Sequence, residues 1–393
     1  MNKNILSKNV QDFIDENLFI DTFKFLLKKN VFKKVSNKEI IVQIQSKSKA
    51  KDKILKWYNT EGILYPPKIN LEQTSSEMTA KYKAQLIRGN SMVDATCGFG
   101  IDAHYFSKSF NKVKCFDLNS KLIEIVKYNS NLLKQNNVQY FNEDGIKYCK
   151  KTTDIYDLLY IDPSRRNTFN KKVFLLNECH PVINNDINQF LAKFNNILIK
   201  CSPLLDLKQT LNQINNIVDI HIIGVKNEVK EILIKIKKND NCRVKIYCIE
   251  LTDRSKDISF YFDQINNKEI TCSNISTYLY EPSPMLLKSG AFNVIKEIYN
   301  LEKLNPNSHL YSSEKLISFQ GRHFKISKLL DYNKNNLKVY YNNQANITTR
   351  NFPYSVQELR RKHKIKDGGS NYLFFTTDAD NNLKILVVNK INE

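Results

Sequence analysis

The chain has 393 residues and a hydrophobic content of 41%, so it can bury more than one core, and two or three domains are expected. It carries 60 Lys and Arg against 40 Asp and Glu, a formal net charge of +20. This excess indicates a polyanionic partner, with nucleic acid first, although the Lys bias of an AT-rich genome is an alternative cause. No apolar stretch approaches the ~18–20 residues of a membrane span, so no membrane partner is expected.

The cysteines exclude further classes of site. All eight are scattered, none forms a C-x-x-C pair, and no histidines cluster near them. The sequence therefore predicts no metal site and no disulfide framework, and it favours a cytoplasmic protein with reduced thiols. Met1-Asn2-Lys3-Asn4 shows no signal peptide. Nothing in the composition specifies an oligomeric state.

Residues 1–73 are predicted to form an N-terminal helical region. Apolar residues recur at helical spacing between Phe13 and Leu27, and a second helix is expected from about Lys38 to Trp57. The Tyr65-Pro66-Pro67 break ends the region, because proline lacks an amide hydrogen and fixes φ. A further helix opens at Thr74-Ser75-Ser76-Glu77, where hydroxyls can cap free amides.

Strand and helix patterns alternate from residue 91. The expected strands are 91–95, 113–117, 138–141, 156–161 and 195–200. The expected helices are 101–108, 119–134, 144–150 and 172–193. Such alternation predicts an α/β fold, a mostly parallel sheet with helices on both faces.

The pattern changes after Cys201-Ser202-Pro203. A helix at 207–215 and a strand at 218–225 are followed by 229–238, which reads as either strand or helix. Two strands at 243–250 and 258–262 look antiparallel, and helices are expected at 285–299 and 355–363. Cys201 closes an apolar strand, so we interpret it as a small buried residue rather than a nucleophile.

The run from Val93 to Asp102 is the most informative motif. An apolar strand ends at Asp94, and Gly98 and Gly100 let the following turn approach a ligand closely. Asp117 ends the next strand, where an acid is placed to bind ribose hydroxyls. The third glycine of the dinucleotide fingerprint is missing, which argues against NAD.

Two more acids follow strand ends in the same order. Asp144 follows the third strand, where it can face an adenine amino group, and Asp162 ends the fourth in Ile161-Asp162-Pro163-Ser164-Arg165-Arg166. Ligands of open α/β sheets bind outside the carboxyl ends of the strands, so the four acids converge on one crevice. A single Asp in such a place is more often a helix cap, but four in order with the glycines favour a cofactor site.

This ordered set resembles class I S-adenosylmethionine (AdoMet)-dependent methyltransferases over about 75–265. The resemblance implies a Rossmann-like fold with a mostly parallel seven-stranded sheet, and AdoMet as the cofactor. It implies that the Asp94-like acid and the glycines hold the methionine part, the Asp117-like acid the ribose and the Asp144-like acid the adenine. The expected cofactor-binding residues are Asp94, Thr96, Gly98, Gly100, Asp102, Asp117, Asp144 and Asp162.

The fourth-strand motif departs from the Asp/Asn-Pro-Pro-aromatic pattern of amino methyltransferases, because Ser164 and Arg165 replace the second proline and the aromatic. The Asp162 carboxylate or the Pro163 carbonyl can still accept a hydrogen bond from an amine. Arg165 and Arg166 suit a phosphate or a stacked base, unless they form salt bridges. The expected catalytic residues are Asp162, Pro163 and Arg165.

The flanking segments extend the resemblance to a Bacteroidetes methyltransferase family. They include 57–67, 75–84, Tyr280-Glu281-Pro282, 321–324, 350–353 and 366–369. The resemblance implies a methyltransferase domain at 74–270, a ferredoxin-like segment at 275–318 and a small α+β THUMP-like domain at 319–393. THUMP domains bind tRNA, so the expected RNA-binding residues are Arg165, Arg166, Arg322, Arg350, Arg360, Arg361 and Lys362. For the helix at 355–363, a solvated basic face is the alternative.

These features predict an AdoMet-dependent methyltransferase that modifies RNA (tRNA or rRNA). Two alternatives stay open at this point: a methyltransferase acting on a small molecule or protein, and a non-catalytic RNA-binding protein that keeps the fold.

Overall fold

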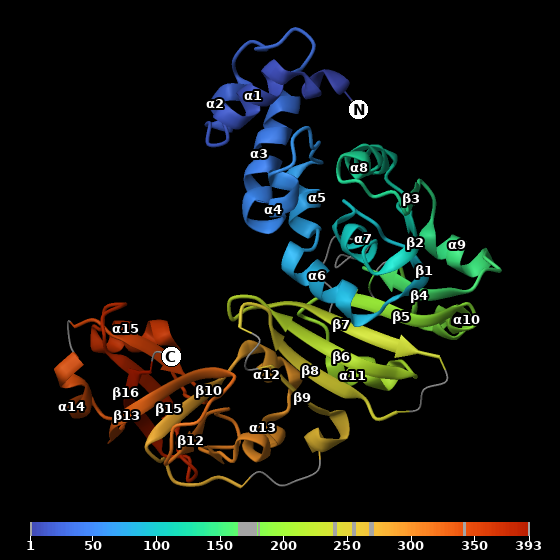
Figure 1. Cartoon of the computed structure of the whole chain (residues 1–393). Helices are drawn as coiled ribbons and strands as arrows, with labels where there is room; N and C mark the ends of the chain where they lie inside the picture. The colour runs from blue at the N-terminus through green and yellow to red at the C-terminus, as the bar shows by residue number, and fades with distance from the viewer. Residues whose placement is uncertain are drawn as a thin grey trace. The chain divides into compact units, whose positions relative to one another are not determined.

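The computed structural model describes residues 2–163, 179, 181–238, 242–253, 257–266, 271–340 and 343–391 (Figure 1). The chain divides into two compact units. The first comprises Met1–Val218 and Leu233–Asn241, and the second comprises Asp219–Ile232 and Cys242–Glu393. Among the described residues, no helix is both long and apolar enough to cross a membrane.

The first unit begins with the predicted helical region. Its helices are η1 (Lys3–Leu6), α1 (Lys8–Glu16), α2 (Thr22–Leu26), α3 (Asn37–Lys53), α4 (Leu55–Tyr58) and α5 (Lys68–Gln73). A capping box starts α3, because Ser36 accepts from the Glu39 amide while Glu39 accepts from the Ser36 amide. Ile14, Phe25 and Ile40 are buried in the small core of this region.

Five parallel strands follow in the first unit, as the alternation predicts. They are β1 (Gly89–Asp94), β2 (Phe110–Phe116), β3 (Val138–Phe141), β4 (Tyr156–Ile161) and β5 (Phe194–Cys201), in the order β3-β2-β1-β4-β5. The helices between and before them are α6 (Glu77–Leu86), α7 (Ile101–Phe106), α8 (Ser120–Leu132), α9 (Gly145–Lys151) and α10 (Ile187–Leu191). Helices α7 and α8 cover one face of the sheet and α9 and α10 the other (Figure 1).

One expectation for these helices is confirmed and another is tested only in part. The hydroxyl that caps α6 belongs to Ser76, which accepts from the Thr79 amide, while Ser75 donates to Asp102 instead. The helix expected at 172–193 falls partly outside the described residues; its described end is a 3-10 turn, η3 (Asn184–Asp186), followed by the short α10.

The complete sheet is mixed and has nine strands in place of the expected seven, in the order β3-β2-β1-β4-β5-β7-β6-β8-β9. The later elements are α11 (Leu207–Gln213), β6 (Ile217–Gly224), β7 (Val229–Lys237), β8 (Lys245–Glu250), β9 (Ile258–Tyr261) and η5 (Phe262–Asn266). The ambiguous segment 229–238 is therefore a strand. Strands β8 and β9 pair antiparallel as predicted, but β8 also pairs parallel with β6 and so extends the sheet.

A second sheet of seven strands forms the rest of the second unit, in the order β11-β12-β10-β13-β16-β15-β14. Its strands are β10 (Tyr278–Pro282), β11 (Glu302–Lys303), β12 (Tyr311–Ser313), β13 (Gly321–Asp331), β14 (Asn346–Thr349), β15 (Tyr372–Thr377) and β16 (Leu383–Lys390). Its helices are α12 (Pro284–Ser289), α13 (Phe292–Tyr299), α14 (Lys334–Leu337), η6 (Lys338–Tyr340) and α15 (Val356–His363).

The helix expected at 285–299 is split in two. Gly290 adopts a left-handed conformation with φ of 70° and ends α12, and α13 starts two residues later. Glycine takes this conformation without the steric penalty of a side chain, which explains the break. Helix α15 forms where it is expected and begins with a capping box of Ser355 and Glu358.

Candidate active site

The turn between β1 and α7 is built from close backbone contacts. Gly98 and Gly100 have φ values of 56° and 76°, which side-chain-bearing residues rarely adopt. A Cβ on Gly100 would lie 2.8 Å from Val126 Cγ1. A Cβ on Gly145, the first residue of α9, would lie 2.4 Å from the Ala95 carbonyl oxygen. The turn therefore depends on glycines both for its shape and for the approach of α9.

Asp94 ends β1 fully buried with half of its carboxylate unsatisfied. Its Oδ1 accepts a hydrogen bond from the Thr96 amide at 3.0 Å. Its Oδ2 has no hydrogen-bond partner among the described residues. Burial raises the pKa of Asp94 well above its ordinary value, and the nearby acids Asp102, Asp162 and Asp117 raise it further. An unsatisfied buried oxygen amid acids is a site that a cation would stabilise.

Asp117 follows the end of β2 and is hydrogen-bonded to the glycine turn. One of its oxygens accepts from the Gly98 amide at 3.0 Å, and the other accepts from the Asn119 amide at 2.8 Å. The next residue, Leu118, is 71% exposed. An acid and an apolar surface thus lie together beside the glycine turn, as a ligand with a hydroxylated sugar and a flat apolar ring requires.

Asp144 occupies the ordinary position of a helix cap. It precedes α9, and its Oδ1 accepts from the Lys147 amide at 3.0 Å. Its other oxygen lies 3.8 Å from Lys147 Nζ. Capping uses only one carboxylate oxygen, so the other oxygen of Asp144 can accept a hydrogen bond from an amino group.

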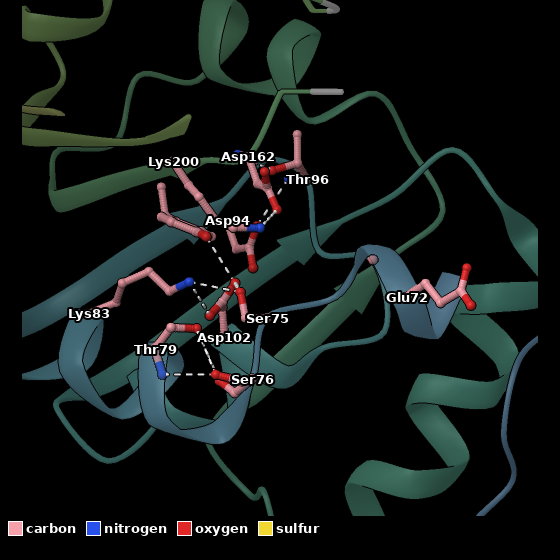
Figure 2. A network of polar contacts seen from close by, with 12 residues as sticks. Glu72, Ser75, Ser76, Thr79, Lys83, Asp94, Thr96, Asp102, Asp162 and Lys200 are labelled. Atoms are coloured by element: carbon pink, nitrogen blue, oxygen red, sulfur yellow. Dashed lines mark hydrogen bonds and ion pairs between the residues drawn. The ribbon is translucent and has the colours of Figure 1, made fainter. Parts of the chain in front are cut away.

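Asp162 lies at the end of β4 and is joined to the end of β1. Its amide donates to Thr96 Oγ1 at 2.7 Å, and its carboxylate meets Lys200 Nζ at 2.5 Å (Figure 2). The Asp162 side chain is 27% exposed, whereas that of Lys200 is 3% exposed. The buried Lys200 therefore holds a carboxylate side chain that remains partly exposed. Pro163 is buried, and the expected site residues Arg165 and Arg166 lie outside the described residues.

Asp102 takes part in a buried ion network (Figure 2). Lys83 of α6 is completely buried and lies 2.9 Å from Asp102 Oδ1. Ser75 and Tyr160 donate to Asp102 Oδ2 at 2.7 and 2.9 Å. Burial alone would raise the pKa of Asp102, but Lys83, Lys200 and the hydrogen bonds outweigh it and lower the pKa below its ordinary value. Both oxygens of Asp102 are thus engaged by protein groups.

One group of side chains near the turn invites comparison with a metal site. The ligand atoms of Asp94, Cys97 and Cys115 lie within 4.8 Å of one another, and all three residues are buried. Metal ligation requires thiolates. A hydrogen bond to Cys115 and burial raise the pKa of Cys97, and burial raises the pKa of Cys115, which favours thiols over thiolates while no metal is bound. The group fits a packed core better than a metal site. Cys201, at the end of β5, is buried as expected.

The expected RNA-binding residues of the second unit fall into two groups. Arg322 and Arg350 both bond to the buried Glu281, and Arg360 bonds to Asp367. Arg361 and Lys362 are exposed on α15. Lys362 Nζ lies 4.1 Å from the centre of the Tyr354 ring, a cation–π distance. The first group is thus paired with acids although Arg322 and Arg350 stay partly exposed, whereas Arg361 and Lys362 lie on the exposed surface of α15.

Three residues of the site were missed by reasoning from sequence: Lys83, Lys200 and Leu118. Lys200 gave one signal, because it follows the apolar run Ile197-Leu198-Ile199 in a buried strand, where a charge needs a partner. Lys83 gave no signal in the sequence, since its pairing with Asp102 depends on how α6 packs. Leu118 is unremarkable until its exposure is known.

Two family models match the C-terminal part of the chain. Residues 278–319 match a ferredoxin-like domain, and residues 321–390 match a THUMP domain-like family. No curated protein matches the sequence.

Solved structures match the rest of the chain as well. A protein named "putative methyltransferase" from Porphyromonas gingivalis W83 is 29% identical, with 99% of each chain covered and a TM-score of 0.87. An rRNA methylase from Streptococcus thermophilus is 13% identical over 42% of this chain and 95% of its own, with a TM-score of 0.32. A tRNA (uracil-54, C5)-methyltransferase from Pyrococcus abyssi is 16% identical over 44% of this chain and 39% of its own, with a TM-score of 0.31. The chain is thus similar in fold to the Porphyromonas protein over nearly its whole length, and its C-terminal part matches a ferredoxin-like and a THUMP domain-like family.

Proposed function

We propose that this protein is an AdoMet-dependent methyltransferase that modifies RNA. The observation that carries the proposal is the buried, half-satisfied carboxylate of Asp94 beside the Gly98–Gly100 turn. AdoMet carries an ammonium and a sulfonium, and Asp94, Asp117 and Asp162 give this edge of the sheet the opposite charge. The residues present thus fit the cofactor.

In this proposal each part of the cofactor has a partner in the chain. Asp94, Thr96 and the backbone at Gly98 and Gly100 bind the methionine part. Asp117 exchanges one of its amide contacts for ribose hydroxyls, Leu118 packs against the adenine, and Asp144 accepts from the adenine amine. Asp102 supports the turn through Lys83 and does not touch the ligand.

The acceptor approaches the end of β4. The Asp162 carboxylate and the Pro163 carbonyl orient an acceptor amine by accepting its hydrogens, while Lys200 fixes the carboxylate in place. AdoMet, when bound, supplies an electrophilic methyl group for in-line transfer. An acceptor amine would attack that methyl group with its lone pair while the bond from the methyl carbon to sulfur breaks and the thioether leaves. The amine would lose its proton to solvent afterwards, so no strong base is required. Arg165 and Arg166 are proposed to contact the phosphate or base of the acceptor.

RNA is the proposed acceptor because of the charge of +20 and the THUMP-like domain. In that domain, Arg361 and Lys362 are the proposed phosphate contacts, while Arg322, Arg350 and Arg360 act mainly by holding Glu281 and Asp367. The proposed division of the chain is 1–73, 74–270, 275–318 and 319–393.

The test is methyl transfer from labelled AdoMet to RNA from a strain that lacks the gene, followed by nucleoside mass spectrometry. We expect one new methylated nucleoside with the wild-type protein and none with Asp162→Ala. Labelling of protein or of small molecules, with no RNA product, would replace the proposal with a methyltransferase of another substrate class. AdoMet-independent RNA binding without any transfer would indicate an RNA-binding protein that keeps the fold.

A further inference from the structure

The segment around α2 exposes several apolar side chains. Phe19, Phe23 and Leu27 follow one another at intervals of four residues, and they are 88%, 73% and 76% exposed. Leu26 and Val31 are also exposed. These five residues are called the N-terminal apolar patch. Of the phenylalanines in this segment, Phe25 enters the core instead.

Lysines alternate with the residues of the patch along the sequence. Residues 19–34 contain Lys24, Lys28, Lys29, Lys33 and Lys34, all exposed. The single acid of this segment is Asp21, which caps α2 by accepting from the Phe23 and Lys24 amides. The other oxygen of Asp21 lies 3.7 Å from Lys24 Nζ, so five lysines stand against one acid in this segment and its net charge is positive.

The backbone that carries the patch is held in place by one buried side chain. Asn37 donates to the carbonyls of Phe25, Lys28 and Lys29 at 3.2, 3.0 and 3.2 Å. Its Oδ1 accepts from the Val31 amide at 3.2 Å. The exposed rings and amines are thus presented by an ordered turn, which lowers the entropy lost when a partner binds.

We propose that this patch is a docking surface for single-stranded RNA. The rings of Phe19 and Phe23 stack on bases, and the lysines of the same segment contact phosphates, the combination by which proteins hold single strands. The cores of protein–protein interfaces are depleted of lysine, which disfavours a protein partner. Helix α2 has only five residues, too few for an amphipathic helix that lies in a membrane surface. The choice of RNA rests on the proposed function, but the surface is separate from the cofactor site.

The test measures binding of a fluorescein-labelled U20 oligonucleotide by anisotropy as a function of salt. Two aromatic variants are compared, Phe19→Ala/Phe23→Ala and Phe19→Leu/Phe23→Leu. If the rings stack on bases, both variants bind at least about ten-fold more weakly than wild type, because leucine is apolar but cannot stack. If only the alanine variant is impaired, plain apolar contact explains the binding and the stacking proposal is overturned.

A lysine pair tests the phosphate contacts. Lys28→Gln/Lys29→Gln should reduce the slope of log affinity against log salt by about 1.4, since each single-strand phosphate contact contributes about 0.7. Lys49→Gln/Lys51→Gln, exposed on α3 outside the patch, is the charge-matched control and should change the slope by less than half as much. Equal effects of the two pairs would overturn a localised site.

Two further readouts separate this inference from the alternatives. Sedimentation that shows a wild-type dimer lost in the alanine variant would assign the patch to a second copy, and patch-dependent flotation with phosphatidylglycerol vesicles would assign it to a membrane. Either result would overturn the RNA proposal. AdoMet calorimetry should give the same affinity in every patch variant. If U20 binds through the patch but AdoMet does not bind, this inference stands and the proposed function fails. If AdoMet binds but U20 binding does not depend on the patch, the proposed function stands and this inference fails.

Discussion

The acids at the carboxyl end of the first sheet and the arginines of the C-terminal domain use their charges in different ways. Asp94 is buried with one oxygen unsatisfied, and Asp162 is partly exposed and paired with the buried Lys200. Arg322 and Arg350 instead share Glu281 between them. Asp94 thus keeps one unsatisfied oxygen, whereas both arginines are paired with an acid although their side chains stay partly exposed. Pairing and burial, rather than the number of charges, indicate which groups can bind.

The largest expected effect comes from breaking the ion network around Asp102. Lys83→Met removes the buried cation that lies 2.9 Å from Asp102 Oδ1. We expect the free energy of unfolding in urea to fall by about 3–5 kcal/mol, the usual cost of an unpaired buried charge. The double variant Lys83→Met/Asp102→Asn is the control and should recover part of this loss. A single-variant loss below about 1 kcal/mol would show that the network is not important for stability.

The next effect concerns Lys200, which is paired with Asp162. Lys200→Met removes the cation that orients the carboxylate, so kcat for methyl transfer should fall about 100-fold with little change in KM for RNA, because misplacement affects the chemical step. Lys200→Arg keeps the charge and should restore part of the rate. Steady-state kinetics with labelled AdoMet provide the measurement. A rise in KM at unchanged kcat would instead place Lys200 in acceptor binding.

The third prediction concerns Asp94, whose ionisation should lower the stability of the folded protein. Its pKa is raised in the folded protein, so its ionisation destabilises the fold as pH rises from about 4, the unfolded value, through the raised folded value. Asp94→Asn keeps the acceptor for the Thr96 amide but cannot ionise. At pH 7 the free energy of unfolding of the variant should therefore exceed that of the wild type. The gain is about 1.4 kcal/mol for each unit by which the pKa of Asp94 is higher in the folded than in the unfolded protein. The gain should vanish near pH 4. Urea titrations at both pH values test this, and an equal gain at the two would contradict the assignment.

The smallest effect separates the two groups of C-terminal cations. Arg361→Gln/Lys362→Gln should weaken tRNA binding and reduce its salt slope by about two, whereas Arg350→Gln should change the slope by less than about one. The reason is that Arg350 already faces Glu281. Filter binding of total tRNA from about 50 to 200 mM salt provides the slopes. Equal slopes for both variants would contradict the division into paired and exposed cations.

Local patterns in the sequence predicted much of the fold. The alternation from residue 91 predicted the five parallel strands, because apolar runs and turns recur at short range. The same reasoning gave no sign that Phe19 and Phe23 are exposed, since spacing alone cannot tell which face of a short helix is buried. It also missed the break at Gly290, a single left-handed residue inside an apolar pattern.

The site could be predicted in part for the same reason. Asp94, Asp117 and Asp162 follow strand ends, which sequence patterns locate well. Their partners could not be predicted, because the contacts join distant parts of the chain. Lys200 meets Asp162 from 38 positions away, and Arg350 meets Glu281 from 69 positions away. Such pairings depend on tertiary packing and leave no local pattern.

The turn after β1 and the acid after β2 are proposed to form one AdoMet site, and isothermal titration calorimetry of AdoMet tests this most directly. We expect one molecule to bind per wild-type chain and Asp117→Ala to weaken binding at least about ten-fold, because a charged hydrogen bond contributes about 1.5–3 kcal/mol. Asp154→Ala, an exposed acid outside the site, is the matched control and should bind normally. No heat with the wild-type protein, or the same affinity in Asp117→Ala, would contradict the assignment of this site.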